Sequence, residues 1–176
     1  YHLHQLGNGI RIIHRQAAGN VSHCALMVNT GSRDELASES GMAHFIEHMI
    51  FKGTGKRKAY HVLSRIENVG GDLNAFTTKE ETCIYASFLT PFYEQSLELF
   101  ADVAFNSTFP ERELAKEKDV IIDEINSYYD NPAELIFDEF EDLVFRGHPL
   151  GRNILGEINT VESFKRTDIF RFINRN

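Results

Sequence analysis

Residues 41–51 constrain the fold of this chain more than any other segment, because they combine a buried-helix pattern with three polar side chains. His44 and His48 are four residues apart, a spacing that places both on one face of a helix. Glu47 follows His44 by three residues and borders the same face. The apolar positions around them are Ala43, Phe45, Ile46, Met49 and Ile50. Since buried polar groups need partners, we expect the three polar side chains to form a binding site.

The three side chains fit the pattern of a zinc site. Two imidazoles at this spacing can converge on one zinc ion, with Zn–N distances of about 2.0–2.1 Å. Glu47 is placed to reach a metal-bound water rather than the metal, as a general base must be. The order is the inverse of the commoner zincin motif. The alternative is a helix that carries two histidines and an acid by chance; such a pattern is expected in about one chain in a hundred or fewer, so we favour the metal site.

A catalytic zinc usually takes three protein ligands, so the third must come from another segment. The long helix predicted after Pro110 carries Glu117 and Glu124 on its apolar side, where an unpaired charge is costly. These two residues are separated by about 10.5 Å along the helix axis, too far for both to contact one zinc ion. One is expected to be a ligand and the other to orient a ligand histidine. Spacing alone does not decide which.

The order of predicted elements, strands first and helices later, indicates one α+β unit without internal repeats. The strands are expected at residues 2–6, 10–15, 22–29, 72–77 and 82–89. The helices are expected at residues 40–51 and 59–69, for about 15 residues after Pro91, at 110–130 and 132–145, and weakly within 160–174. Ser38 or Ser40 is the expected N-cap of the first helix.

Composition excludes several function classes. The formal net charge of −8, from 26 acidic and 18 basic residues, argues against a nucleic-acid partner and mildly favours basic peptides. There is no run of 18 apolar residues, so no membrane span is expected. We expect a soluble protein, cytoplasmic or periplasmic if it is bacterial, of otherwise unknown compartment. Cys24 and Cys83 fall in strand-like runs and are expected to be buried thiols; they lie outside the histidine motif, which argues against a structural zinc site.

The segment 41–54, with its ending Phe-Lys-Gly-Thr, resembles the signature of the pitrilysin/insulinase family of zinc peptidases, which includes the mitochondrial processing peptidases. That family has a ligand glutamate about 76 residues past the second histidine, where Glu124 lies, and a supporting glutamate seven residues earlier, where Glu117 lies. The resemblance implies that His44, His48 and Glu124 bind one Zn²⁺ per chain. It also implies that Glu47 activates water and that Glu117 supports the site from behind the ligands.

Two further segments are similar to the family. Residues 71–77 resemble its edge strand, in which Asn74, Ala75 and Phe76 would line an extended substrate. Addition of a peptide as an extra strand is a sound physical mode of binding; from the residues alone, an ordinary strand is the simpler interpretation. The loop 148–156 is also similar, and His148 is given no catalytic role.

The resemblance implies an α+β fold with a mostly antiparallel sheet covered by helices, cut before its last strands. Residues 1–176 would then be a single zinc metallopeptidase N-terminal domain, incomplete at its C-terminus. A second family domain or partner subunit would close the chamber over a peptide substrate and supply an Arg and a Tyr near the scissile bond. The expected function is that of a zinc metalloendopeptidase that binds peptides in extended form. The alternative is a non-hydrolytic zinc- or peptide-binding subunit or fragment of the same family.

Overall fold

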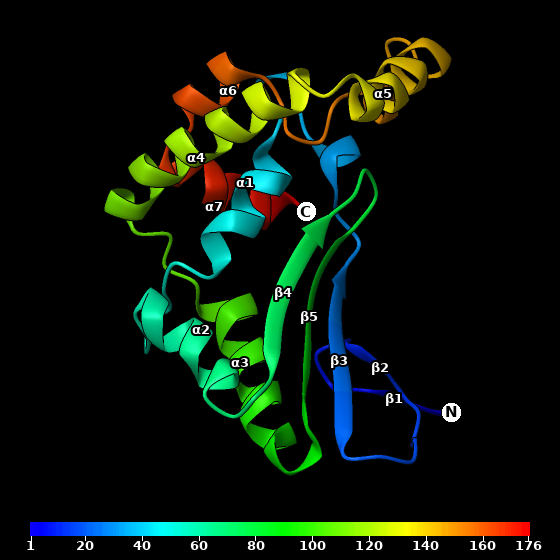
Figure 1. Ribbon diagram of the computed structural model, residues 1–176, viewed down its shortest axis with the longest axis vertical. Coiled ribbons are helices and arrows are strands. Elements are labelled where there is room, and N and C mark those ends of the chain that lie inside the picture. The colour runs from blue at the N-terminus through cyan, green and yellow to red at the C-terminus, as the bar shows by residue number, and fades with distance from the viewer.

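In the computed structural model, which describes residues 1–176, a three-stranded antiparallel sheet lies in the lower part of the molecule, beside two helices (Figure 1). Its strands lie in the order β3 (Val21–Val28), β5 (Thr82–Leu89) and β4 (Asp72–Thr77). β4 pairs with β5 alone and is therefore an edge strand. The N-terminal strands β1 (His2–Gln5) and β2 (Arg11–His14) lie where strands are predicted and pair with each other as a separate hairpin.

Seven α-helices and four short 3₁₀ turns accompany the sheet. The helices are α1 (Met42–Ile50), α2 (Ala59–Glu67), α3 (Tyr93–Asn106), α4 (Glu111–Tyr129), α5 (Pro132–Val144), α6 (Ile158–Ser163) and α7 (Arg166–Arg175). The turns are η1 (Ser32–Asp34), η2 (Ala37–Glu39), η3 (Thr90–Phe92) and η4 (Pro149–Gly151). α2 and α3 pack against the sheet, α1 packs against β4, and α4 packs across α1 (Figure 1).

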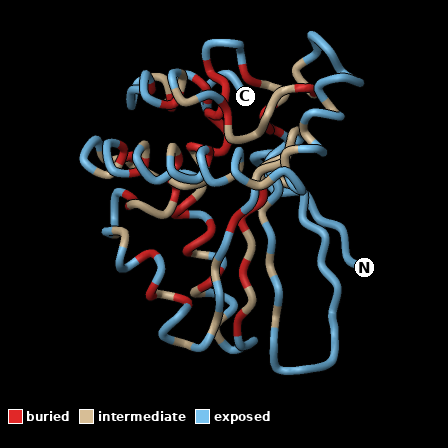
Figure 2. The backbone as a smooth tube through the Cα atoms, turned by 45° about the horizontal axis from the view of Figure 1, so that its top comes forward, coloured by how far each residue is buried: buried red, intermediate tan, exposed pale blue.

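Side-chain alternation decides which sheet face the helices cover. Ser22, Cys24 and Leu26 of β3 are partly buried, whereas the residues between them are exposed. In β5 the matching inward residues Ala86 and Phe88 are buried. Buried residues accordingly gather between the sheet and the helices and around α1 (Figure 2). The mostly antiparallel α+β class predicted from the sequence is confirmed.

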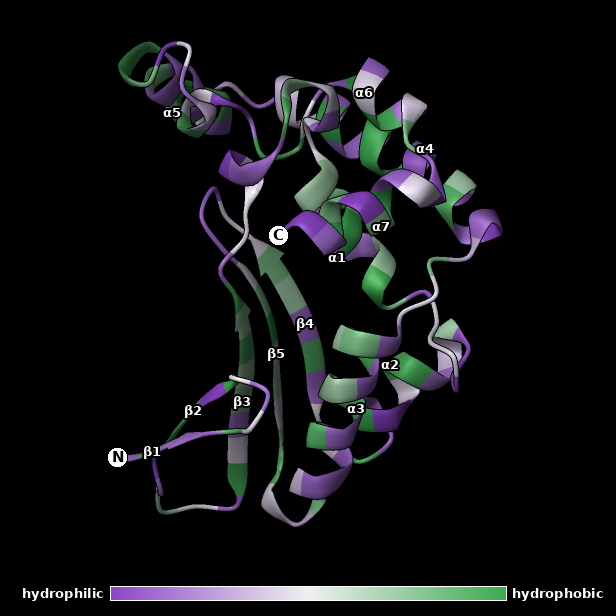
Figure 3. Ribbon diagram, turned by 180° about the vertical axis from the view of Figure 1, so that it is seen from behind, coloured by the Kyte–Doolittle hydropathy of each residue, from purple (hydrophilic) through white to green (hydrophobic).

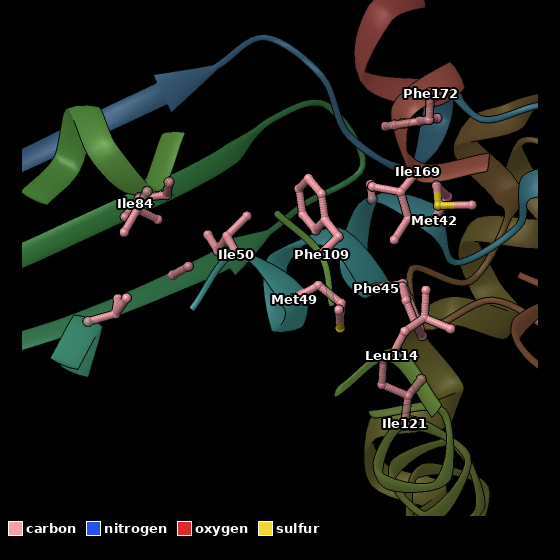
Figure 4. Close-up of a cluster of buried hydrophobic side chains, with 14 of the residues drawn as sticks. Met42, Phe45, Met49, Ile50, Ile84, Phe109, Leu114, Ile121, Ile169 and Phe172 are labelled. Carbon is pink, nitrogen blue, oxygen red and sulfur yellow. The ribbon is translucent and has the colours of Figure 1, made fainter. Parts of the chain in front are cut away.

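The helix α1 is the middle of the core. Met42, Phe45 and Met49 are fully buried on one of its sides, each stabilising the fold by about 1.5–3 kcal/mol. They belong to one cluster with residues of α4 and α7, among them Ile121 and Ile169 (Figure 4). Because one side of α1 is fixed in this core, the side that carries the two histidines has a defined direction.

The predicted elements are found within a few residues of their expected bounds, with one error at the start of α1. Neither Ser38 nor Ser40 caps this helix: the N-cap is Gly41, at φ 91°. The carboxylate of Glu35 takes the capping role instead, accepting N–H bonds from Gly41 and Ala43, 2.9 Å each. Glu35 can reach these N–H groups, although it lies well before the helix in sequence, because η1 and η2 fold back toward the start of α1. No local sequence pattern indicates this fold-back.

Three smaller expectations can be compared with the structure. Pro91 begins the 3₁₀ turn η3, and α3 follows directly from it. Cys83 is buried and Cys24 is partly buried, and both are free thiols. None of the helices has the length and apolar character needed to cross a membrane.

Helix α5 lies at a corner of the molecule (Figure 3). It carries exposed hydrophobic side chains, for example Phe137 and Phe140.

Candidate metal centre

The packing of α4 across α1 brings His44, His48 and Glu124 together. Glu124 Oε2 lies 3.8 Å from Nε2 of His44 and 3.5 Å from Nε2 of His48. One ligand atom from each of the three residues lies within 4.8 Å of the others. These separations are longer than hydrogen bonds. Ligand atoms on a tetrahedral zinc with bonds of about 2.0–2.1 Å are about 3.3 Å apart, so the donor set and its spacing fit a zinc ion.

His48 is held from behind by Glu117. Nδ1 of His48 lies 3.0 Å from Glu117 Oε1, and Nζ of Lys52 lies 2.7 Å from Glu117 Oε2. Burial alone would raise the pKa of Glu117, but the hydrogen bonds with His48 and Lys52 outweigh it and lower the pKa. An ionised Glu117 keeps the proton of His48 on Nδ1. The lone pair of Nε2 is then free on the side of Glu124, the arrangement that a metal ligand requires.

His44 is buried and neutral at physiological pH. Burial, and then the neighbouring His48, lower the pKa of His44 to about 4. Its Nδ1 is buried without a hydrogen-bond partner. The rings of His44 and His48 meet edge to face, with centroids 4.6 Å apart. A neutral, desolvated imidazole in this position is available as a metal ligand.

Glu47 lies beside this cluster on the cleft side of α1. Burial raises the pKa of the Glu47 carboxyl, and the neighbouring Thr77 and His48 oppose part of that rise. Glu47, His44 and Glu124 line the same cleft. A carboxylate whose pKa is raised by burial, and which lies beside a candidate metal site, has the properties of a general base.

The cleft has a volume of about 650 Å³ and runs between α1, α4, the start of α5 and the end of β4. Its lining residues are His44, Glu47, Ala75, Phe76, Thr77, Glu124, Ser127, Tyr128, Asn131, Glu134, Asp138, Asn153, Ile154 and Leu155. Of the predicted substrate contacts, Ala75 and Phe76 line the cleft. Asn74 lies outside it, exposed, with its side-chain oxygen accepting the N–H of Ala75 at 2.9 Å.

Sequence reasoning gave no role to the far end of the cleft. Tyr128 donates its hydroxyl proton to Asp138, and Asn153 donates to the same carboxylate at 2.9 Å. Lys79, in the turn between β4 and β5, lies 3.6 Å from Asp138. Asp138 thus joins three distant segments, and no spacing pattern could have found it. Lys52 was missed for the same reason, although it lies within the motif at 51–54.

Comparisons with known proteins place these residues in a family context. The family model described as Insulinase (Peptidase family M16) matches residues 11–158. The chain is 38% identical over 176 residues to an uncharacterized zinc protease of Rickettsia bellii, covering 99% of this chain and 43% of the relative. It is 38% identical over 172 residues to the mitochondrial-processing peptidase subunit beta of Dictyostelium discoideum, covering 97% of this chain and 37% of that protein. The chain therefore spans about two-fifths of these relatives.

Solved structures share the fold. A protease from Helicobacter pylori superposes with a TM-score of 0.91 at 26% identity, over 97% of this chain and 42% of that one. A peptidase M16 inactive domain from Pseudomonas fluorescens superposes with a TM-score of 0.87 at 20% identity, over 97% of this chain and 42% of that one. The second likeness concerns the fold alone, and it shows that this fold also occurs in a domain described as inactive.

Proposed function

The chain belongs to the insulinase family of peptidases, peptidase family M16, and from this membership we propose that it is the zinc-bearing part of an endopeptidase that hydrolyses peptides held in extended form. One observation carries the proposal. The ligand atoms of His44, His48 and Glu124 lie within 4.8 Å of one another at a cleft that Glu47 also lines. This is a ligand set and a base together, at a surface that a peptide can reach.

His44, His48 and Glu124 would hold one zinc ion per chain. Two imidazoles and one carboxylate form the donor set of a catalytic zinc with an open position, whereas structural sites are closed by four ligands that are usually rich in Cys. When bound, the ion supplies Lewis acidity, which acidifies water and polarises a carbonyl group. Glu117 fixes the ring of His48, so its role in the proposal is to support a ligand.

Glu47 is the proposed general base and acid. Its carboxylate takes a proton from the attacking water and delivers that proton to the leaving amine. The burial that raises the pKa of Glu47 strengthens it as a base and helps it to hold the proton between the two transfers.

The edge strand β4 is the proposed binding site for an extended peptide. Only one side of β4 is paired, so its outer N–H and C=O groups are available to an added strand. Ala75 and Phe76 would contact the peptide inside the cleft, and Asn74 would contact it beyond the cleft. Glu134 also lines the cleft, so we expect a basic side chain to be preferred near it.

We propose further that residues 1–176 form a single zinc-bearing N-terminal domain and that the working enzyme has a second family domain or a partner subunit over this cleft. The proposal is supported by the share of each relative that the chain spans and by the relative named as a subunit. A second candidate function is that of a non-hydrolytic zinc- or peptide-binding unit. It is favoured by the fold shared with an inactive domain, and opposed by the intact set of ligands and base.

Metal analysis followed by a peptidase assay tests these proposals. Purified chain, dialysed exhaustively after loading, is expected to retain about one zinc, and Glu124→Gln is expected to lose it. Glu47→Gln should retain the zinc but hydrolyse no peptide. Wild type that holds no zinc after reconstitution would refute the metal site. A complete enzyme, with its second domain or partner subunit, that holds zinc, binds an extended basic peptide and hydrolyses nothing would favour the second candidate.

A further inference from the structure

The start of α1 is held by a side chain from outside the helix. Glu35 is 3% exposed, and its two carboxylate oxygens accept the N–H groups of Gly41 and Ala43, both at 2.9 Å. Gly41 has no side chain that could cap the helix itself. Glu35 thus satisfies two of the N–H groups that a helix start leaves unpaired. The second of them belongs to the residue immediately before His44.

Glu35 and the start of α1 also contact residues 152–156, part of which forms one wall of the cleft. Nη1 of Arg152 donates to the backbone oxygen of Glu35 at 2.6 Å. A Cβ atom placed on Gly156 would lie 2.4 Å from the backbone oxygen of Ser40, and one on Gly41 would lie 2.6 Å from that of Leu155. The two glycines therefore let the backbones touch. Residues 153–155, which line the cleft, are fixed between these two attachments.

We propose that Glu35 is a positioning residue of the metal site: it fixes the first turn of α1 against residues 152–156 and so sets where His44 stands relative to the cleft wall. The inference rests on the proposed function, since it assumes that the site binds a metal. His48 has its own support from Glu117, whereas His44 Nδ1 has no partner. The position of His44 therefore depends on the backbone of its own turn.

Replacement of Glu35 by glutamine removes one of the two hydrogen-bond acceptors at the start of α1. Burial raises the pKa of Glu35 to about 8, and the N–H groups of Ala43 and Gly41 together with Arg152 oppose that rise, while Glu39 adds to it. In either protonation state, two N–H donors face the two side-chain oxygens. The glutamine amide has one oxygen only, so its NH₂ group would face an N–H donor, and the turn must move.

Glu39→Gln is the matched control. Glu39 is 5% exposed and close in sequence, and it accepts the N–H of Leu36 at 3.0 Å and pairs with Arg175. It makes no hydrogen bond to α1. Both variants are therefore expected to lower the melting temperature, but only Glu35→Gln should change the metal site.

The experiment is a Co²⁺ titration of wild type and both variants, followed by visible absorption, which reports coordination geometry, alongside thermal unfolding. We expect Glu35→Gln to bind Co²⁺ about tenfold more weakly, at the lower end of the effect of support residues, with altered absorption bands. Glu39→Gln should stay within about twofold of wild type, since it touches no ligand. A Glu35→Gln variant with wild-type affinity and bands would overturn the inference, leaving Glu35 a simple cap.

Two other outcomes are also decisive. If Glu35→Gln does not fold, Arg152→Met replaces it, because it removes only the attachment of the cleft wall to Glu35. We then expect Arg152→Met to bind Co²⁺ about threefold or more weakly than wild type, a smaller effect than that of removing a direct support of a ligand. Unchanged binding would overturn the inference. Failure of wild type itself to bind Co²⁺ would instead overturn the proposed function, and the inference with it.

Discussion

Glu117→Gln is the most direct test of how the metal centre is supported. The substitution keeps the shape of the side chain but removes its charge, so the 3.0 Å contact with His48 Nδ1 becomes a neutral hydrogen bond. Charge-assisted bonds are worth about 1.5–3 kcal/mol and neutral ones about 0.5–1.5 kcal/mol. Lys52 loses its ion pair as well, but its side chain is 30% exposed and can be rehydrated.

The expected result is a loss of zinc affinity of about 10- to 100-fold, as found for residues that orient a ligand histidine. That loss corresponds to about 1.4–2.8 kcal/mol; the change from a charge-assisted to a neutral hydrogen bond, about 1–1.5 kcal/mol, accounts for the lower end of this range. The assay is a competition for zinc between the protein and a chromophoric chelator near neutral pH. Glu113→Gln is the matched control, since Glu113 lies on the same helix and pairs only with Lys116, at 2.9 Å.

A Glu117→Gln variant that is folded and binds zinc as wild type does would refute this role of Glu117. It would then follow that the direction of the His48 ring is fixed by the packing of α1 alone. A loss of affinity equally large in Glu113→Gln would also refute it, because the effect would come from the charge of α4 and not from the contact with His48.

Other predictions concern activity and stability. Glu47→Gln should leave zinc content unchanged while peptide hydrolysis by the complete enzyme falls by a factor of at least about 100, measured by cleavage of a fluorogenic peptide. The pKa of Glu117 is lower in the folded state than in the unfolded state. The ionised Glu117 therefore stabilises the metal-free protein above the unfolded pKa of 4.5, and this stabilisation is lost as the pH falls through the folded-state pKa. In urea unfolding, the stabilities of wild type and Glu117→Gln should converge in acid. Asp102 is 2% exposed and is bound by Thr54 and Arg57. Its replacement by alanine should lower the free energy of unfolding by about 1–3 kcal/mol, because Arg57 keeps its ion pair with Glu98; the same unfolding experiment measures this.

Local pattern was sufficient for most of the fold. The strands predicted at residues 2–6, 10–15 and 22–29 and the helix predicted at 132–145 rest on local signals, and these elements lie close to where they are expected. The cap of α1 was missed because the capping carboxyl group belongs to Glu35, which is separated from the helix by the 3₁₀ turn η2. Distant partners of this kind are fixed by tertiary packing, which a single sequence does not display.

In the candidate site, too, some residues could be predicted from local sequence pattern and others could not. His44 and His48 could be paired from spacing alone, since one helix carries both. The choice between Glu117 and Glu124 needed a family resemblance, because it depends on how α4 crosses α1. The structure places Glu124, with a side chain 44% exposed, near both histidines, and Glu117, with a side chain 7% exposed, behind His48. The apolar stripe of α4 thus overstated the burial of Glu124.

The charges around the candidate centre give a separate physical argument for a divalent cation. Three carboxyl groups, those of Glu47, Glu117 and Glu124, adjoin two histidines, and Lys52 is the cation paired with this group. His44 is neutral because burial lowers its pKa. Metal ligation requires neutral imidazoles and ionised carboxylates; in that state the cluster carries −3 + 1 = −2, which one divalent cation balances. Such a cation would also oppose the rise that burial causes in the pKa of Glu47, which favours the ionised carboxylate that a general base requires.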